Sequence, residues 1–186
     1  PLAWLTFVGA VTEKIKLITG VLILPQRNPV ILAKHLATID RLTNGRLELG
    51  VGVGWLREEF NALNVPFEQR GARTDEYIQA MRKLWQEDGA TFKGKFIEFD
   101  SINCNPKPIG KKLPIIIGGH SARAVRRAAR FGDGFFPATG MQTDVAAILD
   151  LLQEEMHKIG RDPKDIEIMT GCPEALPGSG HDPLKA

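Results

Sequence analysis

The chain has 186 residues, of which 43% are hydrophobic and 25% are charged, and its formal net charge is +2 at pH 7. This composition is ordinary for a globular domain with a core of its own. The small net charge and the scattered Lys and Arg residues argue against a nucleic-acid partner, and no apolar run approaches membrane-spanning length. Since no signal-peptide pattern opens the chain, we expect a cytoplasmic protein with reduced thiols at Cys104 and Cys172.

Helix and strand patterns alternate along the chain. Asn28 and Pro29 are typical of a helix start, and Asn44-Gly45 is typical of a turn. Helices are expected at 2–11, 28–42, within 55–64, at 70–87, from Ser121, and at 143–159. Strands are expected at 15–24 (interrupted at Thr19-Gly20), 46–53, 114–117, 134–138 and 166–170, with a small hairpin at 91–99.

The five longer strands are continuous apolar runs separated by helices, which predicts a parallel sheet buried on both faces. Two architectures fit this pattern, a doubly wound open sheet and a (β/α) barrel. A barrel needs eight strands and about 250 residues, so the pattern alone favours the open sheet.

Glycines mark the point where one strand ends and a helix begins. Gly118-Gly119 follows an apolar run, and a helical pattern opens at Ser121. Glycines let the backbone approach a phosphate closely, and helix-start amides carry partial positive charge. The segment therefore predicts an anion site, although a plain helix cap with turn glycines explains it as well.

Gly50, Gly52 and Gly54 alternate along the strand at 46–53, which places them on one face. A face without side chains indicates close approach of a ligand or of another backbone. The His residues and carboxylates show no metal-ligand spacing, so no metal site is expected.

The segment NPVILAKHLATIDRLTNGRLELGVGVGW, residues 28–55, resembles the bacterial luciferase-like superfamily of flavin and deazaflavin oxidoreductases. TEKIKLITGVLILPQRNP before it, and FEQRGARTDEYIQAMRKLW and PIIIGGHSARAVRRAARFGDGFFP after it, follow the family's order. The resemblance covers residues 1–172 and is greatest to the branch that uses coenzyme F-420.

The resemblance implies an α/β fold of the (β/α)8 TIM-barrel type, here incomplete, with about five parallel strands and a small hairpin insertion. Residues 1–172 would form the partial barrel domain, and 173–186 an irregular tail. Two strands would be missing before Pro1, and the final strand and helix would also be absent.

The resemblance also implies where ligands bind. A non-proline cis peptide at Gly20-Val21 would support the cofactor ring, and the loops around Gly118 and Gly140 would bind its phosphate. Catalytic residues stay unknown, because Trp55 stands where some deazaflavin dehydrogenases have a glutamate. The implied cofactor-binding residues are Gly20, Val21, Gly54, Gly118, Gly119, His120, Ser121, Thr139 and Gly140. The implied substrate-pocket residues are Leu24, Trp55 and Glu58.

The function implied is an oxidoreductase that transfers a hydride between coenzyme F-420 and a small organic substrate. The first alternative is a monooxygenase that uses reduced flavin mononucleotide (FMN) and oxygen. The second is a truncated, non-catalytic flavin-binding or phosphate-ligand-binding protein. Relatives commonly form homodimers, so a homodimer is expected.

Overall fold

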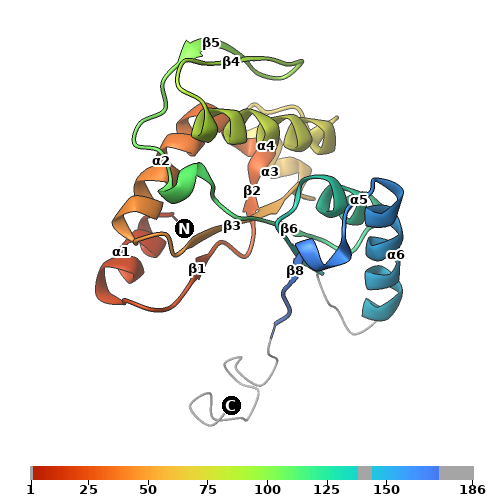
Figure 1. The fold of residues 1–186 in the computed structure, drawn as a ribbon. Helices are drawn as coiled ribbons and strands as arrows, with labels where there is room; N and C mark the ends of the chain where they lie inside the picture. Colours follow the sequence, from red (N-terminus) through yellow and green to blue (C-terminus); the bar gives the residue numbers. More distant parts are fainter. Residues whose placement is uncertain (1, 138–143, 172–186) are drawn as a thin grey trace.

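The computed structural model describes residues 2–137 and 144–171, and its ribbon is a curved sheet with helices on one side (Figure 1). The helices are α1 Leu2–Val11, α2 Pro29–Leu42, α3 Arg57–Ala62, α4 Arg70–Gln86, α5 Ala122–Phe131 and α6 Val145–Lys158, with short 3-10 turns η1 Leu24–Gln26, η2 Ile109–Lys111 and η3 Pro163–Asp165. The strands are β1 Leu17–Ile18, β2 Leu22–Ile23, β3 Leu47–Gly52, β4 Ala90–Lys93, β5 Glu98–Ile102, β6 Ile115–Gly118, β7 Gly134–Phe136 and β8 Glu167–Ile168.

The order of strands in the sheet identifies the architecture. Within the described residues the order is β1-β3-β6-β7-β8, with β2 also paired to β3, and every pairing in this sheet is parallel. A doubly wound sheet reverses its strand order at a switch point, whereas here each strand lies beside its predecessor. Helices α1, α2, α4, α5 and α6 lie outside the curve (Figure 1). The described chain is therefore part of a barrel, and the incomplete-barrel prediction is confirmed.

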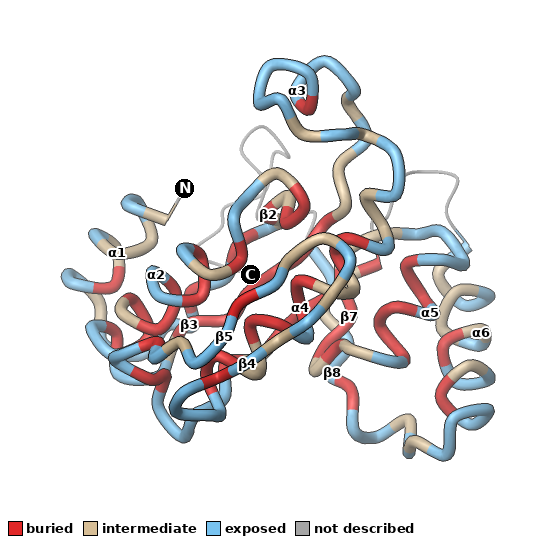
Figure 2. The backbone as a smooth tube through the Cα atoms, turned by 90° about the horizontal axis from the view of Figure 1, so that it is seen from above, coloured by how far each residue is buried: buried red, intermediate tan, exposed pale blue. Residues whose placement is uncertain are grey.

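Side chains of β3 alternate between two environments. Leu47, Leu49 and Val51 belong to the core between the sheet and the helices, and all three are at most 1% exposed. The alternate residues, Glu48 and Gly50 among them, face the inside of the curve. Figure 2 shows β3 buried along its length, while α3 projects from the body of the molecule with mostly exposed residues.

Local sequence explains the limits of α2, which the pattern predicted closely. Asn28 caps the first turn, since its Oδ1 accepts hydrogen bonds from Val30 N at 3.0 Å and Ile31 N at 3.2 Å. The chain turns after Leu42 through Asn44 and Gly45, which both have positive φ.

The predicted strand at 15–24 consists of two short strands, and the predicted interruption at Thr19-Gly20 is confirmed. β1 and β2 both pair with β3, and Thr19 to Val21 bulge between them. The peptide bond Gly20-Val21 is cis, as the resemblance implied.

The hairpin of β4 and β5 is held by a side chain of α4. Glu76 accepts hydrogen bonds from the backbone N–H groups of Lys95, Phe96 and Ile97, at 2.9, 2.7 and 2.8 Å. The hairpin thus extends over the outer side of α4 (Figure 1). Among the described helices, none is long and apolar enough to cross a membrane.

Candidate functional site

The ends of the parallel strands define the edge at which a barrel of this kind binds ligands. β2, β3 and β6 end at Ile23, Gly52 and Gly118, and their neighbouring loops lie at the same edge because the strands are parallel and in register. In (β/α) barrels this C-terminal edge carries the active site.

The bulge at Thr19 to Val21, between β1 and β2, packs closely against β3, where glycines leave space for it. A Cβ atom on Gly50 would lie 1.8 Å from the Thr19 carbonyl oxygen, and one on Gly52 would lie 2.6 Å from Val21 Cγ2. The glycine alternation therefore serves close approach of another backbone and of a valine, which is the second of the two explanations left open by the sequence. Thr19 also donates from Oγ1 to the Gly50 carbonyl at 2.8 Å.

Val21 joins two parts of the predicted cofactor site. A Cβ on Gly118 would lie 2.7 Å from Val21 Cγ1, so the valine packs directly on the end of β6. The ring-support segment, Gly20-Val21, and the start of the phosphate turn are therefore adjacent. This proximity links residues almost a hundred positions apart in the sequence.

The turn from Gly118 to Ser121 connects the end of β6 to the start of α5. Gly119 has φ 139°, a conformation that L side chains rarely adopt, and its N–H donates to the Phe136 carbonyl at 3.1 Å. Ser121 caps α5 by accepting from Ala124 N at 3.3 Å. His120 and Ser121 are exposed. The turn and the start of a ten-residue helix are thus open to a ligand.

Gly54 turns the chain after β3 with φ 77°. Its carbonyl accepts from Arg70 Nε at 2.9 Å, and the Arg70 guanidinium stacks on Phe67 at 3.8 Å. A Cβ on Gly54 would lie 2.8 Å from atoms of Ile23 and Phe60. The backbone turn and the local packing therefore both require glycine at position 54. Its contact with a cofactor stays a prediction.

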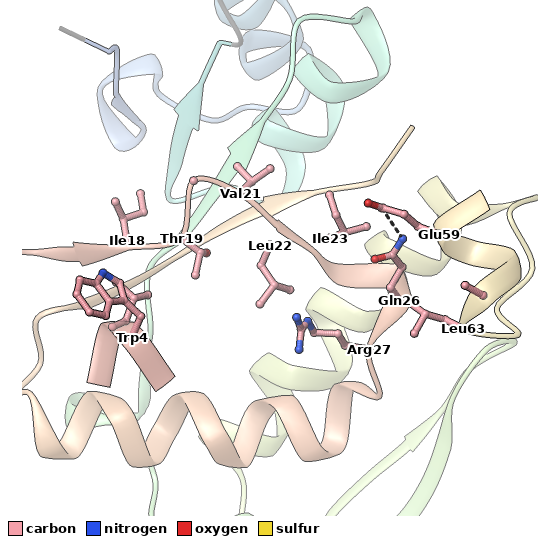
Figure 3. A pocket seen from close by; sticks show the side chains of 13 residues that line it. Trp4, Ile18, Thr19, Val21, Leu22, Ile23, Gln26, Arg27, Glu59 and Leu63 are labelled. Atoms are coloured by element: carbon pink, nitrogen blue, oxygen red, sulfur yellow. Dashed lines mark hydrogen bonds between the residues drawn. The ribbon is translucent and has the colours of Figure 1, made fainter. Parts of the chain in front are cut away.

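Two cavities border the bulge. The larger, of about 690 Å³, lies between α1, the first strand and α3, and is lined among others by Trp4, Ile23 and Leu63 (Figure 3). The smaller, of about 280 Å³, lies on the inside of the sheet and is lined among others by Ile116 and Phe136. Ile18, Thr19, Gly20 and Val21 line both.

The structure places the three predicted substrate-pocket residues differently. Leu24 is fully buried in the core and lines neither cavity, so its assignment to the substrate pocket stays a prediction. Trp55 is 81% exposed and lines neither cavity. Glu58 is exposed outside the cavities, whereas its neighbour Glu59 lines the larger one and accepts a hydrogen bond from Gln26 Nε2 at 3.2 Å.

The sequence analysis missed several lining residues. Gln26 and Arg27 lie at the end of the first strand, where any barrel places functional loops, so their position was a usable signal. Ile18 and Trp4 gave none, since they are ordinary apolar residues. Thr139 and Gly140, predicted at the phosphate, lie outside the described residues. Within the described residues, no group of three His, Cys, Asp or Glu side chains could hold a metal ion.

Comparison with known proteins agrees with this geometry. The family model described as luciferase-like monooxygenase matches residues 1–175. The FMNH(2)-dependent dimethylsulfone monooxygenase of Pseudomonas fluorescens (strain Pf0-1) is 41% identical over 131 residues, which are 68% of this chain and 35% of that protein.

Solved structures show the same fold. Monooxygenase RslO1 from Streptomyces bottropensis superposes with a TM-score of 0.81 at 28% identity, over 92% of this chain and 54% of RslO1. An F420-dependent secondary alcohol dehydrogenase, solved with an F420-acetone adduct, gives 0.79 at 25% identity, over 91% and 52%. The chain thus spans from about a third to just over half of the proteins it resembles. With the family model matching nearly its whole length, the chain belongs to the luciferase-like monooxygenase family.

Proposed function

We propose that the protein is a flavin-dependent monooxygenase that uses reduced FMN. The observation that carries this is the contact of Val21 with the end of β6, which puts the predicted ring support beside the predicted phosphate turn. The choice of FMN rests on the 41% identity to the FMNH(2)-dependent Pseudomonas enzyme. It therefore differs from the coenzyme F-420 preference of the sequence analysis.

The residues present fit a phosphorylated flavin. Glycine at 119 leaves the turn free of a side chain, where a Cβ would lie 2.8 Å from Ala124 Cβ. Backbone groups of the turn and the start of α5 would hold the phosphate, with the Ser121 hydroxyl beside them. Thr139 and Gly140 stay predicted as further phosphate contacts.

The described residues would orient a bound flavin and its substrate and shield them from water. Bound reduced flavin supplies the electrons for oxygen chemistry, and the protein supplies orientation and a dry surface. Val21 and Ile18, which line both cavities, would form an apolar wall that excludes water from a bound ring and substrate. Ionisable groups on the cavity walls in the described chain are Arg27 and Glu59, and we assign neither as the catalytic residue.

Coenzyme F-420 is the second candidate, favoured by the likeness to the F420-dependent secondary alcohol dehydrogenase. A deazaflavin reacts poorly with oxygen, so this version would transfer a hydride to or from an organic substrate. The same turn and the same wall would hold it.

Equilibrium binding of FMN and coenzyme F-420, side by side, tests the proposal. We expect FMN to bind the purified chain and Gly119→Ala to weaken binding about tenfold or more, which corresponds to about 1.4 kcal/mol. Gly160→Ala is the matched control, because Gly160 also has positive φ, at 69°, but no atom lies within 4 Å of its added Cβ. Binding of F-420 alone would select the hydride-transfer function. FMN binding with no effect of the protein on the reoxidation of reduced FMN by oxygen would favour the non-catalytic alternative.

We further propose a homodimer, with α1 at its interface. Trp4, Phe7 and Val11 are 67%, 59% and 66% exposed, and their spacing places them along one side of the helix. Trp4 and Phe7 stack with ring centroids 5.8 Å apart. Exposed apolar patches of this kind mark interaction surfaces. Light scattering should report a dimer that Phe7→Glu dissociates, whereas Ile159→Glu on the far side of the fold should leave it intact.

A further inference from the structure

Met169 lies where the last described strand meets the smaller cavity. It follows β8, and its N–H donates to the Phe135 carbonyl at 2.9 Å, so its backbone continues the pairing of β8 with β7. The register of these strands places Met169 beside Phe136, and both residues line the cavity of about 280 Å³. Hydrogen bonding to the neighbouring strand therefore fixes the point from which the thioether borders this cavity.

Met169 differs from the other methionines that the structure describes. Met81 and Met156 are both 0% exposed and belong to the core between the sheet and the helices. Met169 is half-buried and is not part of that core. The fourth methionine, Met141, lies outside the described residues. A small reagent in the cavity can therefore reach the sulfur of Met169, whereas close packing shields the other two described sulfurs.

The smaller cavity also borders the segment predicted to support the cofactor ring. Gly20 and Val21 line it together with Met169. None of its described lining side chains carries a charge, and Thr19 and Thr170 supply its hydroxyl groups. A reactive molecule released at the ring support thus enters a cavity in which, among the described lining residues, the Met169 thioether is the group that peroxides oxidise readily.

Reduced flavin and oxygen together supply such a molecule. When no substrate is oxidised, dioxygen takes two electrons and two protons from reduced FMN and leaves as hydrogen peroxide. The peroxide then transfers one oxygen atom to a thioether: a sulfur lone pair forms the new S–O bond, the O–O bond breaks, and water leaves. The sulfur loses the two electrons that the peroxide gains, so the step needs no further reagent. The product, methionine sulfoxide, is polar and can be reduced back by methionine sulfoxide reductases.

We propose that Met169 is a site of oxidative modification, converted to the sulfoxide by hydrogen peroxide that forms at the cofactor when oxygen is reduced without substrate. The inference rests on the proposed function, since reduced FMN is the source of the peroxide. The sulfoxide places a polar oxygen on a wall that Val21 and Ile18 make apolar. The modification therefore weakens the binding of an apolar ring when substrate is scarce, and reduction of the sulfoxide restores it.

Peptide mapping by mass spectrometry, with fragmentation that locates each sulfoxide, tests the inference. Wild-type protein in excess over photoreduced FMN is mixed with air-saturated buffer containing catalase, which destroys peroxide that leaves the protein. We expect at least about tenfold more sulfoxide at Met169 than at Met81 or Met156, the internal controls in the same sample. Hydrogen peroxide added without FMN should show the same preference for Met169, and catalase should abolish this second reaction.

Gly119→Ala is the matched variant, because Gly119 does not line the smaller cavity and its substitution should weaken FMN binding. With reduced FMN and catalase, this variant should lose most of the Met169 sulfoxide that the wild type forms. With added peroxide and no catalase, the variant and the wild type should form equal amounts. Equal sulfoxide in the two proteins under catalase would overturn bound FMN as the source of the peroxide.

Equal oxidation of the three described methionines by added peroxide would overturn the inference, because Met169 would then have no special access. FMN affinity, measured in the same samples, separates the inference from the proposed function. FMN binding without Met169 sulfoxide under catalase overturns the role of Met169 alone. Absence of FMN binding overturns the cofactor assignment and the source of the peroxide together, whatever the reaction of Met169 with added peroxide.

Discussion

Lys16 Nζ lies 3.6 Å from Glu167 Oε2, although these residues belong to opposite ends of the sheet. Lys16 precedes β1, and Glu167 is in β8. The ammonium also lies 2.7 Å from Oε1 of Glu48, whose side chain is 7% exposed. The curvature is thus strong enough for one lysine to connect both edge strands across the inside of the half-barrel.

Lys16→Met should destabilise the fold by about 1–3 kcal/mol. The change keeps the length of the side chain but removes the positive charge beside the buried Glu48, whose Oε2 already has no hydrogen-bond partner among the described residues. Loss of a buried pair costs about 3–5 kcal/mol, and the 61% exposure of Lys16 reduces this figure. Urea unfolding measures it, with exposed Lys14→Met as control. Equal midpoints for the two variants would contradict the prediction.

Alkaline pH should weaken the same interaction. The hydrogen bond and charge of Glu48 raise the pKa of Lys16 above its ordinary value of 10.5. A raised lysine pKa stabilises the folded state fully below the ordinary value, and the effect disappears as pH rises through the folded-state value. The wild type should therefore lose more stability than Lys16→Met between about pH 10 and pH 12. Parallel curves for the two proteins would refute this.

Asp40→Asn should flatten the pH dependence of stability at acidic pH. Burial raises the pKa of Asp40 above its ordinary value of 3.8, although Oδ2 accepts from Ile109 N at 2.8 Å. The folded state then holds a proton that the unfolded state has lost, so this residue's contribution to stability falls as pH rises through that window. The free energy of unfolding, measured between about pH 4 and pH 7, should include this decrease with rising pH in the wild type and lack it in Asp40→Asn.

Gly50→Ala should destabilise the protein by about 3 kcal/mol or more, because the new Cβ would meet the backbone oxygen of Thr19 and neither strand can move away without losing its pairing. Gly171→Ala is the control, since no atom lies within 4 Å of its added Cβ. Thermal unfolding compares them. A Gly50→Ala protein as stable as the control would show that the bulge is free to shift.

Cys104 should resist thiol reagents in the native protein. Its side chain is 3% exposed, and burial raises the pKa of the thiol above its ordinary value of 9.0. The thiolate is the reactive form, so both effects slow the reaction. In a Cys172→Ser background, the dye release with Ellman's reagent at about pH 8 should occur only after denaturant is added. Rapid release from native protein would contradict the burial.

Much of the fold follows from local sequence. Asn28-Pro29 fixed the start of α2, and the turn at Asn44-Gly45 fixed its end, because capping and positive φ depend on neighbouring residues. The open sheet favoured by the pattern alone was wrong, since curvature depends on packing between distant segments. Only the resemblance indicated a barrel.

The site was predicted less completely. The turn at Gly119 and the helix cap at Ser121 were predicted because a turn and a cap leave local signals, while their contact with a phosphate stays a prediction. Glu58 was chosen over Glu59 because adjacent residues in a short helix have the same pattern, and only the position of α3 against η1 separates them. Leu24 was assigned to the pocket because an apolar residue at a strand end has the same appearance whether it faces ligand or core.

Val21 packs directly against Gly52 and Gly118, so the residue tolerated at each of these three positions depends on the other two. Neither glycine can acquire a side chain while the valine remains, whereas an alanine at position 21 would release both. Val21 also lines both cavities. A smaller residue at position 21 would therefore enlarge both cavities and would also leave space for side chains at positions 52 and 118. Changes in cavity size, whether natural or engineered, should therefore begin at position 21, with substitution of the glycines following it.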